Sequence, residues 1–130
     1  MSRAGGKGAG KVLIVDDDAF IRRPLEYILR EEGFEPRTAV DGDDCLGKVA
    51  GERPDLIILD VMMPGKDGFE VCRCIKGEPA LADIPIILLS ARGRDHDREK
   101  GLALGAAEFM TKPYSPSDLL RRVRQLLSEN

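Results

Sequence analysis

PDLIILDVMMPGKDG, residues 54–68, contains the strand around which the rest of this 130-residue chain is organised. Residues 56–59 form an unbroken apolar run, which is typical of a strand covered on both faces in a parallel sheet. Asp60 follows the run directly, and a proline and two glycines soon interrupt regular structure. We therefore expect Asp60 at the carboxyl end of the strand, where open α/β sheets bind ligands. Taken alone, an aspartate at this position is more often a turn residue.

Strands and helices are predicted to alternate five times along the chain. The predicted strands are Val12–Val15, Phe34–Val40, Leu56–Leu59, Ile84–Leu89 and Ala107–Thr111. The predicted helices cover residues 18–32, 41–49, 67–76, 94–104 and 115–127. This alternation indicates an α/β fold in which right-handed crossovers place helices on both faces of a parallel sheet.

The first predicted helix carries its own start and stop signals. Asp18 is a favourable N-cap, and Gly33 is the residue expected to end the helix. Pro24 removes one backbone hydrogen bond, so we expect it to bend the helix without ending it. Helical spacing assigns an inward apolar face to Phe20, Leu25, Ile28 and Leu29.

The last two predicted helices differ in how they are held to the sheet. In the closing helix, Ser115 is the expected cap and Pro116 the first helical residue. Its apolar stripe consists of Leu119, Leu120, Val123, Leu126 and Leu127. The helix over residues 94–104 is polar, so we expect few core residues in it and weak attachment to the core.

Composition limits the number of domains and the classes of partner. The length suits one domain; we assign the glycine-rich residues 1–10 to a disordered N-terminus and residues 11–130 to the folded domain. The net charge of −3 argues against direct nucleic-acid binding. Apolar runs are far shorter than the roughly 20 residues of a membrane span, and the N-terminus has no apolar signal core. We therefore expect a cytoplasmic protein without a membrane partner.

The cysteines, Cys45, Cys72 and Cys74, are odd in number and match no zinc spacing. Two residues apart on a helix, Cys72 and Cys74 would point to different sides and could not easily share a metal. We expect free cysteines in a reduced compartment that act as small packing residues.

Polar residues follow four of the predicted strands. Because the carboxyl ends of parallel strands meet at one edge, several side chains should converge there: Asp16, Asp17, Asp60, Ser90 and Lys112. Crowded carboxylates repel one another unless a cation joins them, and Mg²⁺ prefers such oxygen ligands. The hydroxyl and the amine would complete a cradle for a phosphoryl group, with Asp60 as nucleophile. Each residue taken alone could be a helix cap or an ordinary surface group, but their joint placement favours a metal- and phosphoryl-binding site.

Four segments carry a resemblance to a known family: KVLIVDDD at 11–18, PDLIILDVMMPGKDGFEVC at 54–72, IPIILLSA at 84–91 and GAAEFMTKPYSP at 105–116. In order and spacing they resemble the receiver domain of two-component response regulators, and the likeness extends from Lys11 to Leu127. It implies a flavodoxin-like, doubly wound (βα)5 fold with a parallel sheet of order 2-1-3-4-5. It also implies a phosphoacceptor signalling domain that catalyses only its own Mg²⁺-dependent phosphorylation and dephosphorylation.

The resemblance further implies roles for the acidic residues of the predicted site. Asp60 would accept a phosphoryl group from a sensor histidine kinase or a histidine phosphotransfer protein. Asp17 and Asp60 would ligate Mg²⁺ together with the backbone carbonyl of Met62, and Asp16 would contribute through water.

The remaining site residues would sense the phosphoryl group. Ser90 and Lys112 would bind its oxygens, and the Lys112–Pro113 bond is expected to be cis. Phe109 matches the switch aromatic of the family, which turns inward when Ser90 moves toward the phosphoryl group. The surface of the fourth helix, the fifth strand and the fifth helix would then signal to a downstream effector.

Departures from the family leave the assembly open. Some DNA-binding regulators dimerise through that same surface and carry acidic residues where this chain has Ala103 and Ala107, although Arg98, Glu108 and Arg122 fit. Homodimer formation is therefore left open. No DNA-binding domain follows in the sequence, which is compatible with a single-domain regulator or with an excised receiver.

Three other interpretations fit less well. Phosphatases of the haloacid dehalogenase class share the pattern D-x-D-x-[T/V]; Asp16 and Asp18 begin it, but Phe20 replaces the required Thr or Val, and the chain is too short for the usual cap. A dinucleotide-binding module would need a G-x-G-x-x-G after the first strand, which the sequence lacks. A pseudo-receiver that signals without phosphate is disfavoured because all five site residues are present.

Overall fold

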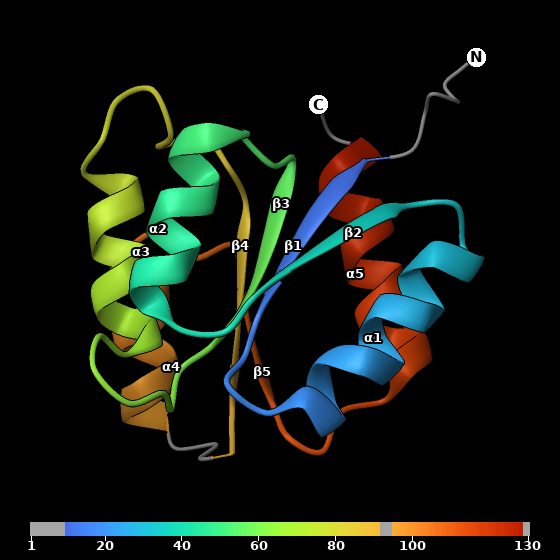
Figure 1. The fold of residues 1–130 in the computed structure, drawn as a ribbon. Helices are drawn as coiled ribbons and strands as arrows, with labels where there is room; N and C mark the ends of the chain where they lie inside the picture. The colour runs from blue at the N-terminus through green and yellow to red at the C-terminus, as the bar shows by residue number, and fades with distance from the viewer. Residues whose placement is uncertain (1–9, 92–94, 129–130) are drawn as a thin grey trace.

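The computed structural model describes residues 10–91 and 95–128, which form a parallel sheet with helices on both faces (Figure 1). The strands are β1 Lys11–Val15, β2 Glu35–Ala39, β3 Leu56–Asp60, β4 Ile86–Ser90 and β5 Glu108–Thr111. The helices are α1 Ala19–Glu31, α2 Gly42–Gly51, α3 Gly68–Lys76, α4 Asp95–Ala103 and α5 Pro116–Ser128. The sheet order β2-β1-β3-β4-β5 confirms the flavodoxin-like fold that the resemblance implied.

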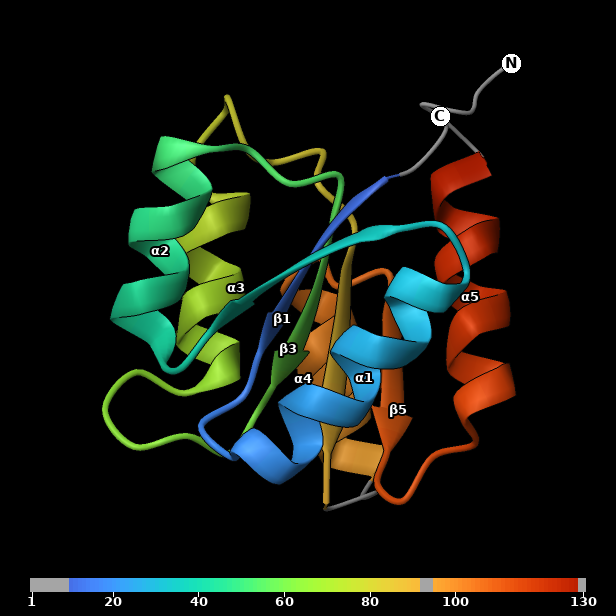
Figure 2. The same ribbon diagram turned by 45° about the vertical axis from the view of Figure 1, so that its right-hand side comes forward.

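Different helices cover the two faces of the sheet, as Figures 1 and 2 show together. α1 and α5 pack on one face, where Ile58 belongs to the same apolar cluster as Leu29 and Val123. α2, α3 and α4 lie on the other face, where Leu59 shares a cluster with Val71. Adjacent residues of β3 therefore enter opposite cores, which explains why its apolar run has no polar alternation.

The start of β2 and the N-terminal segment depend on backbone hydrogen bonds. β2 begins at Glu35 because the Phe34 N–H donates to Leu29 O at the end of α1, at 3.0 Å. Residues 1–9 of the segment predicted to be disordered lie outside the described residues. The Gly10 carbonyl accepts a hydrogen bond from the Glu35 N–H at 2.9 Å, so this glycine adjoins the edge of the sheet.

Two other predicted boundaries differ from the structure. β4 begins at Ile86 rather than Ile84, since Pro85 has no N–H to donate to a strand neighbour. α4 is described from Asp95, and its predicted start at Arg94 falls outside the described residues. The other predicted elements agree to within a few residues at each end.

α1 begins and ends as predicted. The Asp18 carboxylate caps it by accepting a hydrogen bond from the Phe20 N–H at 2.9 Å. Gly33 ends it with a φ of 92°, a left-handed conformation that glycine adopts without strain. The helix runs through Pro24 without interruption.

The inward position predicted for Phe20 is wrong, because its side chain is 88% exposed. Leu25 and Leu29 are buried and lie one turn apart on the same face. Phe20 is five residues before Leu25, which is about 140° around the helix, so its ring points away from the core.

The contrast predicted between the last two helices is confirmed. Leu119 and Val123 of α5 are buried, and the other three leucines of its stripe pack beside them. Ser115 caps α5 by accepting a hydrogen bond from the Asp118 N–H at 3.3 Å. In α4, Gly101 is the one buried residue among those described. No helix in the described ranges has both the length and the apolar character needed to cross a membrane.

Two of the three free cysteines behave as packing residues, as expected. Cys45 and Cys72 are buried, whereas Cys74 is exposed on the other side of α3. Burial raises the pKa of the Cys45 thiol to about 12, so this group stays a neutral, unreactive thiol.

Candidate functional site

The adjacent strands β1 and β3 bring acidic residues together at the carboxyl edge of the sheet. Asp60 is the last residue of β3, and the pairing of Val15 with Leu59 places Asp16 beside it. Asp16 and Asp60 are 3% and 4% exposed, whereas Asp17 is exposed. One carboxylate oxygen from each of these three aspartates lies within 4.8 Å of the others. The predicted acidic cluster is therefore present.

Lys112 completes this cluster from the end of β5. Its Nζ lies 3.0 Å from Asp60 Oδ1 and 3.1 Å from Asp16 Oδ2. The Lys112 N–H donates to Ser90 O at 2.8 Å, which ties the residue to the end of β4. The Lys112–Pro113 bond is cis, as predicted. One ammonium group thus bridges two buried carboxylates from two other strands.

The loop between β1 and α1 is held by its own polar groups. The Asp18 N–H donates to Asp16 Oδ1 at 2.9 Å, so the Asp16 carboxylate is fixed from two sides. Arg22 Nη1 donates to the Asp16 carbonyl at 2.7 Å. The contact of Arg22 was not predicted from the sequence, where the residue is recognisable only as a basic side chain one turn into the helix after the acidic run.

The loop after β3 approaches Asp60 closely because of a glycine. A Cβ at Gly68 would lie 2.5 Å from the carbonyl oxygen of Asp60, a distance that no side chain tolerates. Gly68 therefore allows the start of α3 to pack directly against the strand end. Met62 lies in this loop, and its backbone acts to lower the pKa of the Asp60 carboxyl, against the effect of burial.

The electrostatics of the site follow from two buried acids and one cation. Burial raises the pKa of the Asp60 carboxyl and the neighbouring Asp16 charge adds to this, although the Lys112 hydrogen bond opposes it. The pKa of Lys112 is also raised: burial would lower it, but the hydrogen bonds and charges of Asp60 and Asp16 outweigh burial. With Asp17 nearby, three carboxylates face one ammonium group, so the site has excess negative charge and oxygen donors that suit Mg²⁺.

Replacing Asp60 by asparagine should raise the free energy of unfolding of the metal-free protein by about 1 kcal/mol at neutral pH. Because the pKa of Asp60 is raised on folding, its ionisation destabilises the native state as the pH rises through that value, and asparagine cannot ionise. Lys112 keeps Asp16 as a partner in the variant. Urea denaturation in the presence of a chelator measures the difference, which should narrow as the pH falls toward the ordinary aspartate pKa of 3.8. A variant less stable than wild type at neutral pH would contradict this account of the site.

Ser90 and Phe109 lie on the neighbouring strands β4 and β5. Ser90 is the buried last residue of β4, the strand next to β3. Phe109 pairs with Leu88, two residues before Ser90, so the Phe109 ring and the Ser90 side chain share one face of the sheet. The ring is 1% exposed, which places the aromatic side chain inside the protein in this structure.

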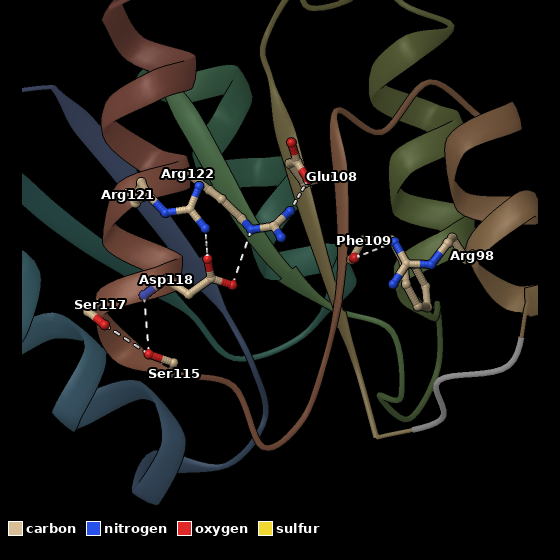
Figure 3. A network of polar contacts seen from close by, with 8 residues as sticks. All are labelled: Arg98, Glu108, Phe109, Ser115, Ser117, Asp118, Arg121 and Arg122. Atoms are coloured by element: carbon tan, nitrogen blue, oxygen red, sulfur yellow. Dashed lines mark hydrogen bonds and ion pairs between the residues drawn. The ribbon is translucent and has the colours of Figure 1, made fainter.

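Arg98 has a contact that the sequence analysis did not anticipate. The guanidinium lies over the Phe109 ring, and Nη1 donates to the Phe109 carbonyl at 3.1 Å (Figure 3). The sequence indicated only that Arg98 suits a dimer surface, because no local pattern connects it with a strand that follows the helix.

Comparison with known proteins agrees with this fold. Residues 12–124 match the family model described as the response regulator receiver domain. The phosphate regulon transcriptional regulatory protein PhoB of Escherichia coli (strain K12) is 39% identical over 119 residues, which are 92% of this chain and 52% of that protein. The alkaline phosphatase synthesis transcriptional regulatory protein PhoP of Bacillus subtilis (strain 168) is 43% identical over 117 residues, 90% of this chain and 48% of that protein. The chain spans about half the length of these curated relatives.

Solved structures show the same similarity. The signal receiver domain of a signal transduction histidine kinase from Syntrophus aciditrophicus has a TM-score of 0.87 and 40% identity, covering 93% of this chain and 92% of that chain. The chemotaxis protein CheY4 of Vibrio cholerae has a TM-score of 0.86 and 34% identity, covering 91% and 98%.

Proposed function

The chain belongs to the response regulator receiver domain family, and on this premise we propose that Asp60 accepts a phosphoryl group from a histidine kinase or a histidine phosphotransfer protein. The observation that carries the proposal is the position of Lys112 Nζ, within hydrogen-bond distance of both Asp60 and Asp16 at an acidic cluster. A receiver domain is a signalling domain rather than an enzyme with a separate substrate. Its catalysis of its own phosphorylation and dephosphorylation is part of the proposal.

The transfer step uses the Asp60 carboxylate as nucleophile. One carboxylate oxygen attacks phosphorus, the bond from phosphorus to the donor's nitrogen breaks, and the electron pair remains on the donor histidine. Lys112 neutralises charge on the phosphoryl oxygens, because its Nζ already lies 3.0 Å from Asp60 Oδ1. Ser90, at the end of the neighbouring strand, would bind another phosphoryl oxygen.

A magnesium site is the second part of the proposal. Asp17 and Asp60 would hold Mg²⁺ with the backbone carbonyl of Met62, and Asp16 would act through water. The donor set fits, since three carboxylates offer oxygens within 4.8 Å of one another. When bound, Mg²⁺ supplies positive charge that offsets the repulsion between the carboxylates and incoming phosphoryl oxygens.

The partners and location belong to the same proposal. The chain would receive the phosphoryl group from its kinase or phosphotransfer protein and pass the signal to an effector through the surface of α4, β5 and α5. Its relatives PhoB and PhoP are named as transcriptional regulators, which is consistent with an effector domain in those longer proteins. We place the protein in the cytoplasm because its three cysteines are free.

The direct test uses the wild-type protein with acetyl phosphate and Mg²⁺. We expect one phosphoryl group per chain by intact mass, and we expect hydroxylamine to remove it because an acyl phosphate reacts with this nucleophile. Omission of Mg²⁺ should prevent the modification. A protein that remains unmodified with Mg²⁺ present would overturn the proposed function.

Replacing Ser90 by alanine should leave Asp60 open to phosphorylation but weaken the response of α4 and β5. Alanine has no hydroxyl to hydrogen-bond the phosphoryl group, so residue 90 would not move toward it. The packing around the Phe109 ring would then change less on phosphorylation. Amide hydrogen exchange with and without beryllofluoride, a phosphoryl mimic, measures the response. We expect the change in α4 and β5 to fall to less than half of the wild-type change.

Ser128→Ala, at an exposed serine at the far end of α5, is the matched control and should respond like wild type. An undiminished response in the Ser90 variant would show that Ser90 does not transmit the signal. Unchanged exchange over α4 and β5 in wild type would instead show that these elements do not respond to the phosphoryl mimic.

A further inference from the structure

α4 lacks the apolar face by which the other helices are held. Gly101 is its one buried residue, and Leu102 is 45% exposed. Charged side chains occupy most of the remaining positions, among them Arg98 and Lys100. A helix with this pattern gains little from apolar burial, so other contacts must hold it to the sheet.

The place where α4 packs is formed by two aromatic rings. A Cβ at Gly101 would lie 3.2 Å from the Phe109 ring, 3.6 Å from the Phe69 ring and 2.8 Å from Leu88. The backbone of the helix therefore rests directly on both rings, which come from β5 and α3. Phe109 is 1% exposed and Phe69 is 8% exposed, so the rings are almost fully covered.

Two cations of α4 lie over these same rings. Arg98 Cζ is 5.4 Å from the centroid of the Phe109 ring, and Lys100 Nζ is 4.5 Å from the centroid of the Phe69 ring. Both distances are within the range of cation–π attraction. Arg98 makes a second contact, because its Nη1 donates to the Phe109 carbonyl at 3.1 Å (Figure 3). A hydrogen bond from a charged donor is stronger than a neutral one.

Arg98 thus contacts the edge strand β5 from the α4 side, whereas other residues hold this strand on the α5 side. β5 is the last strand of the sheet. On the α5 side, Arg122 forms ion pairs with Glu108 of β5 and with Asp118 (Figure 3). α5 also buries apolar side chains, whereas α4 does not. The attachment of α4 therefore depends on a few polar contacts, of which those of Arg98 involve both the backbone and the ring of Phe109.

We propose that Arg98 is a latch that fastens α4 to β5 and holds the Phe109 ring in its buried position. The helix is held largely by cation–π contacts of Arg98 and Lys100. It can therefore detach without exposing apolar side chains of its own. The latch thereby sets how easily α4 moves. Its coupling to the phosphoryl group rests on the proposed function, but the latch itself is a property of the unmodified protein.

Arg98→Met tests the latch, because methionine keeps a flexible apolar stem and a high helix propensity but has neither charge nor donor. We expect the amides in the second half of α4 to exchange about tenfold faster in the unmodified variant, since a charge-assisted hydrogen bond and a cation–π contact are lost together. Exchange in α2 should change less than twofold. Residue-resolved hydrogen exchange by NMR measures both.

Three further variants separate the latch from a general loss of stability. Arg98→Lys keeps the charge but loses the planar fork, so it should give an intermediate effect. Lys100→Met loses a cation over Phe69 and should have a smaller effect than Arg98→Met. Glu99→Gln, between them on the same helix, should match wild type. The proposal is wrong if Arg98→Met leaves α4 exchange within twofold of wild type, or if α2 accelerates as much as α4.

Hydrogen exchange of the same variants with beryllofluoride tests whether the phosphoryl group is coupled to the release of α4. In Arg98→Met the mimic should change α4 exchange less than in wild type, because the helix is already released. If the mimic alters nothing in wild type while Arg98→Met still accelerates α4, the latch stands and the proposed switch of α4 and β5 fails. If the mimic changes α4 exchange as much in Arg98→Met as in wild type, the latch plays no part in the switch.

Discussion

Asp60→Asn should abolish the uptake of a phosphoryl group from acetyl phosphate, with a rate lower by a factor on the order of a thousand or more. An amide has no ionised oxygen to attack phosphorus, whereas the Asp60 carboxylate lies beside Lys112 and Asp16 in a buried acidic cluster. Intact mass after incubation with Mg²⁺ and acetyl phosphate measures the loss. The variant should stay folded, because we expect asparagine to stabilise the metal-free protein.

A matched control shows that the loss is specific to this carboxylate. Asp83 is an exposed acid whose side chain pairs with Arg53 away from the site, so Asp83→Asn should be phosphorylated like wild type. Uptake by Asp60→Asn at the wild-type rate would show that another residue is the acceptor, and the assignment of Asp60 would be withdrawn.

Asp17→Ala should have the second largest effect, with Mg²⁺ affinity at least tenfold lower and no detectable phosphorylation. Mg²⁺ keeps most of its water, so the few protein ligands decide whether it is held at all. Lys112 already engages Asp16 and Asp60, which increases the importance of the exposed Asp17 carboxylate. Titration calorimetry measures the affinity, and we expect even the wild-type protein to bind Mg²⁺ weakly without a phosphoryl group.

Two neighbouring acids provide the comparison for this prediction. Asp16→Ala should weaken Mg²⁺ binding less than Asp17→Ala, because its proposed contribution passes through water. Asp18→Ala should retain Mg²⁺ affinity while losing stability of about 1 kcal/mol, since Asp18 is the N-cap of α1. Equal Mg²⁺ affinity in wild type and Asp17→Ala would remove Asp17 from the proposed metal site.

Most of the fold could be predicted because its signals are local. The unbroken run 56–59 indicates a strand buried on both faces, and residues such as Asp18 and Gly33 define helix ends through their own backbone contacts. Errors arose where a local signal was extended too far. Phe20 is apolar but lies on the wrong side of α1, and Pro85 shortens β4.

The candidate site could also be predicted, because parallel strands bring their carboxyl ends to one edge. Asp16, Asp60 and Lys112 each follow or end a strand, so the strand assignment alone brings them together. The electrostatics could not be predicted in the same way. The pKa of Asp60 depends on its burial and on Lys112, which is 52 residues away in the sequence.

The sequence by itself determined the order of strands and helices, their caps and the identity of the residues at the sheet edge, since each of these depends on neighbours along the chain. Only the tertiary structure decided how α4 is held. Its polar sequence has no apolar stripe to indicate a buried face, and the rings beneath it belong to α3 and β5. Arg98 and Lys100 look like ordinary surface charges until the fold brings Phe109 and Phe69 under them, because cation–π contacts depend on partners that no local pattern specifies.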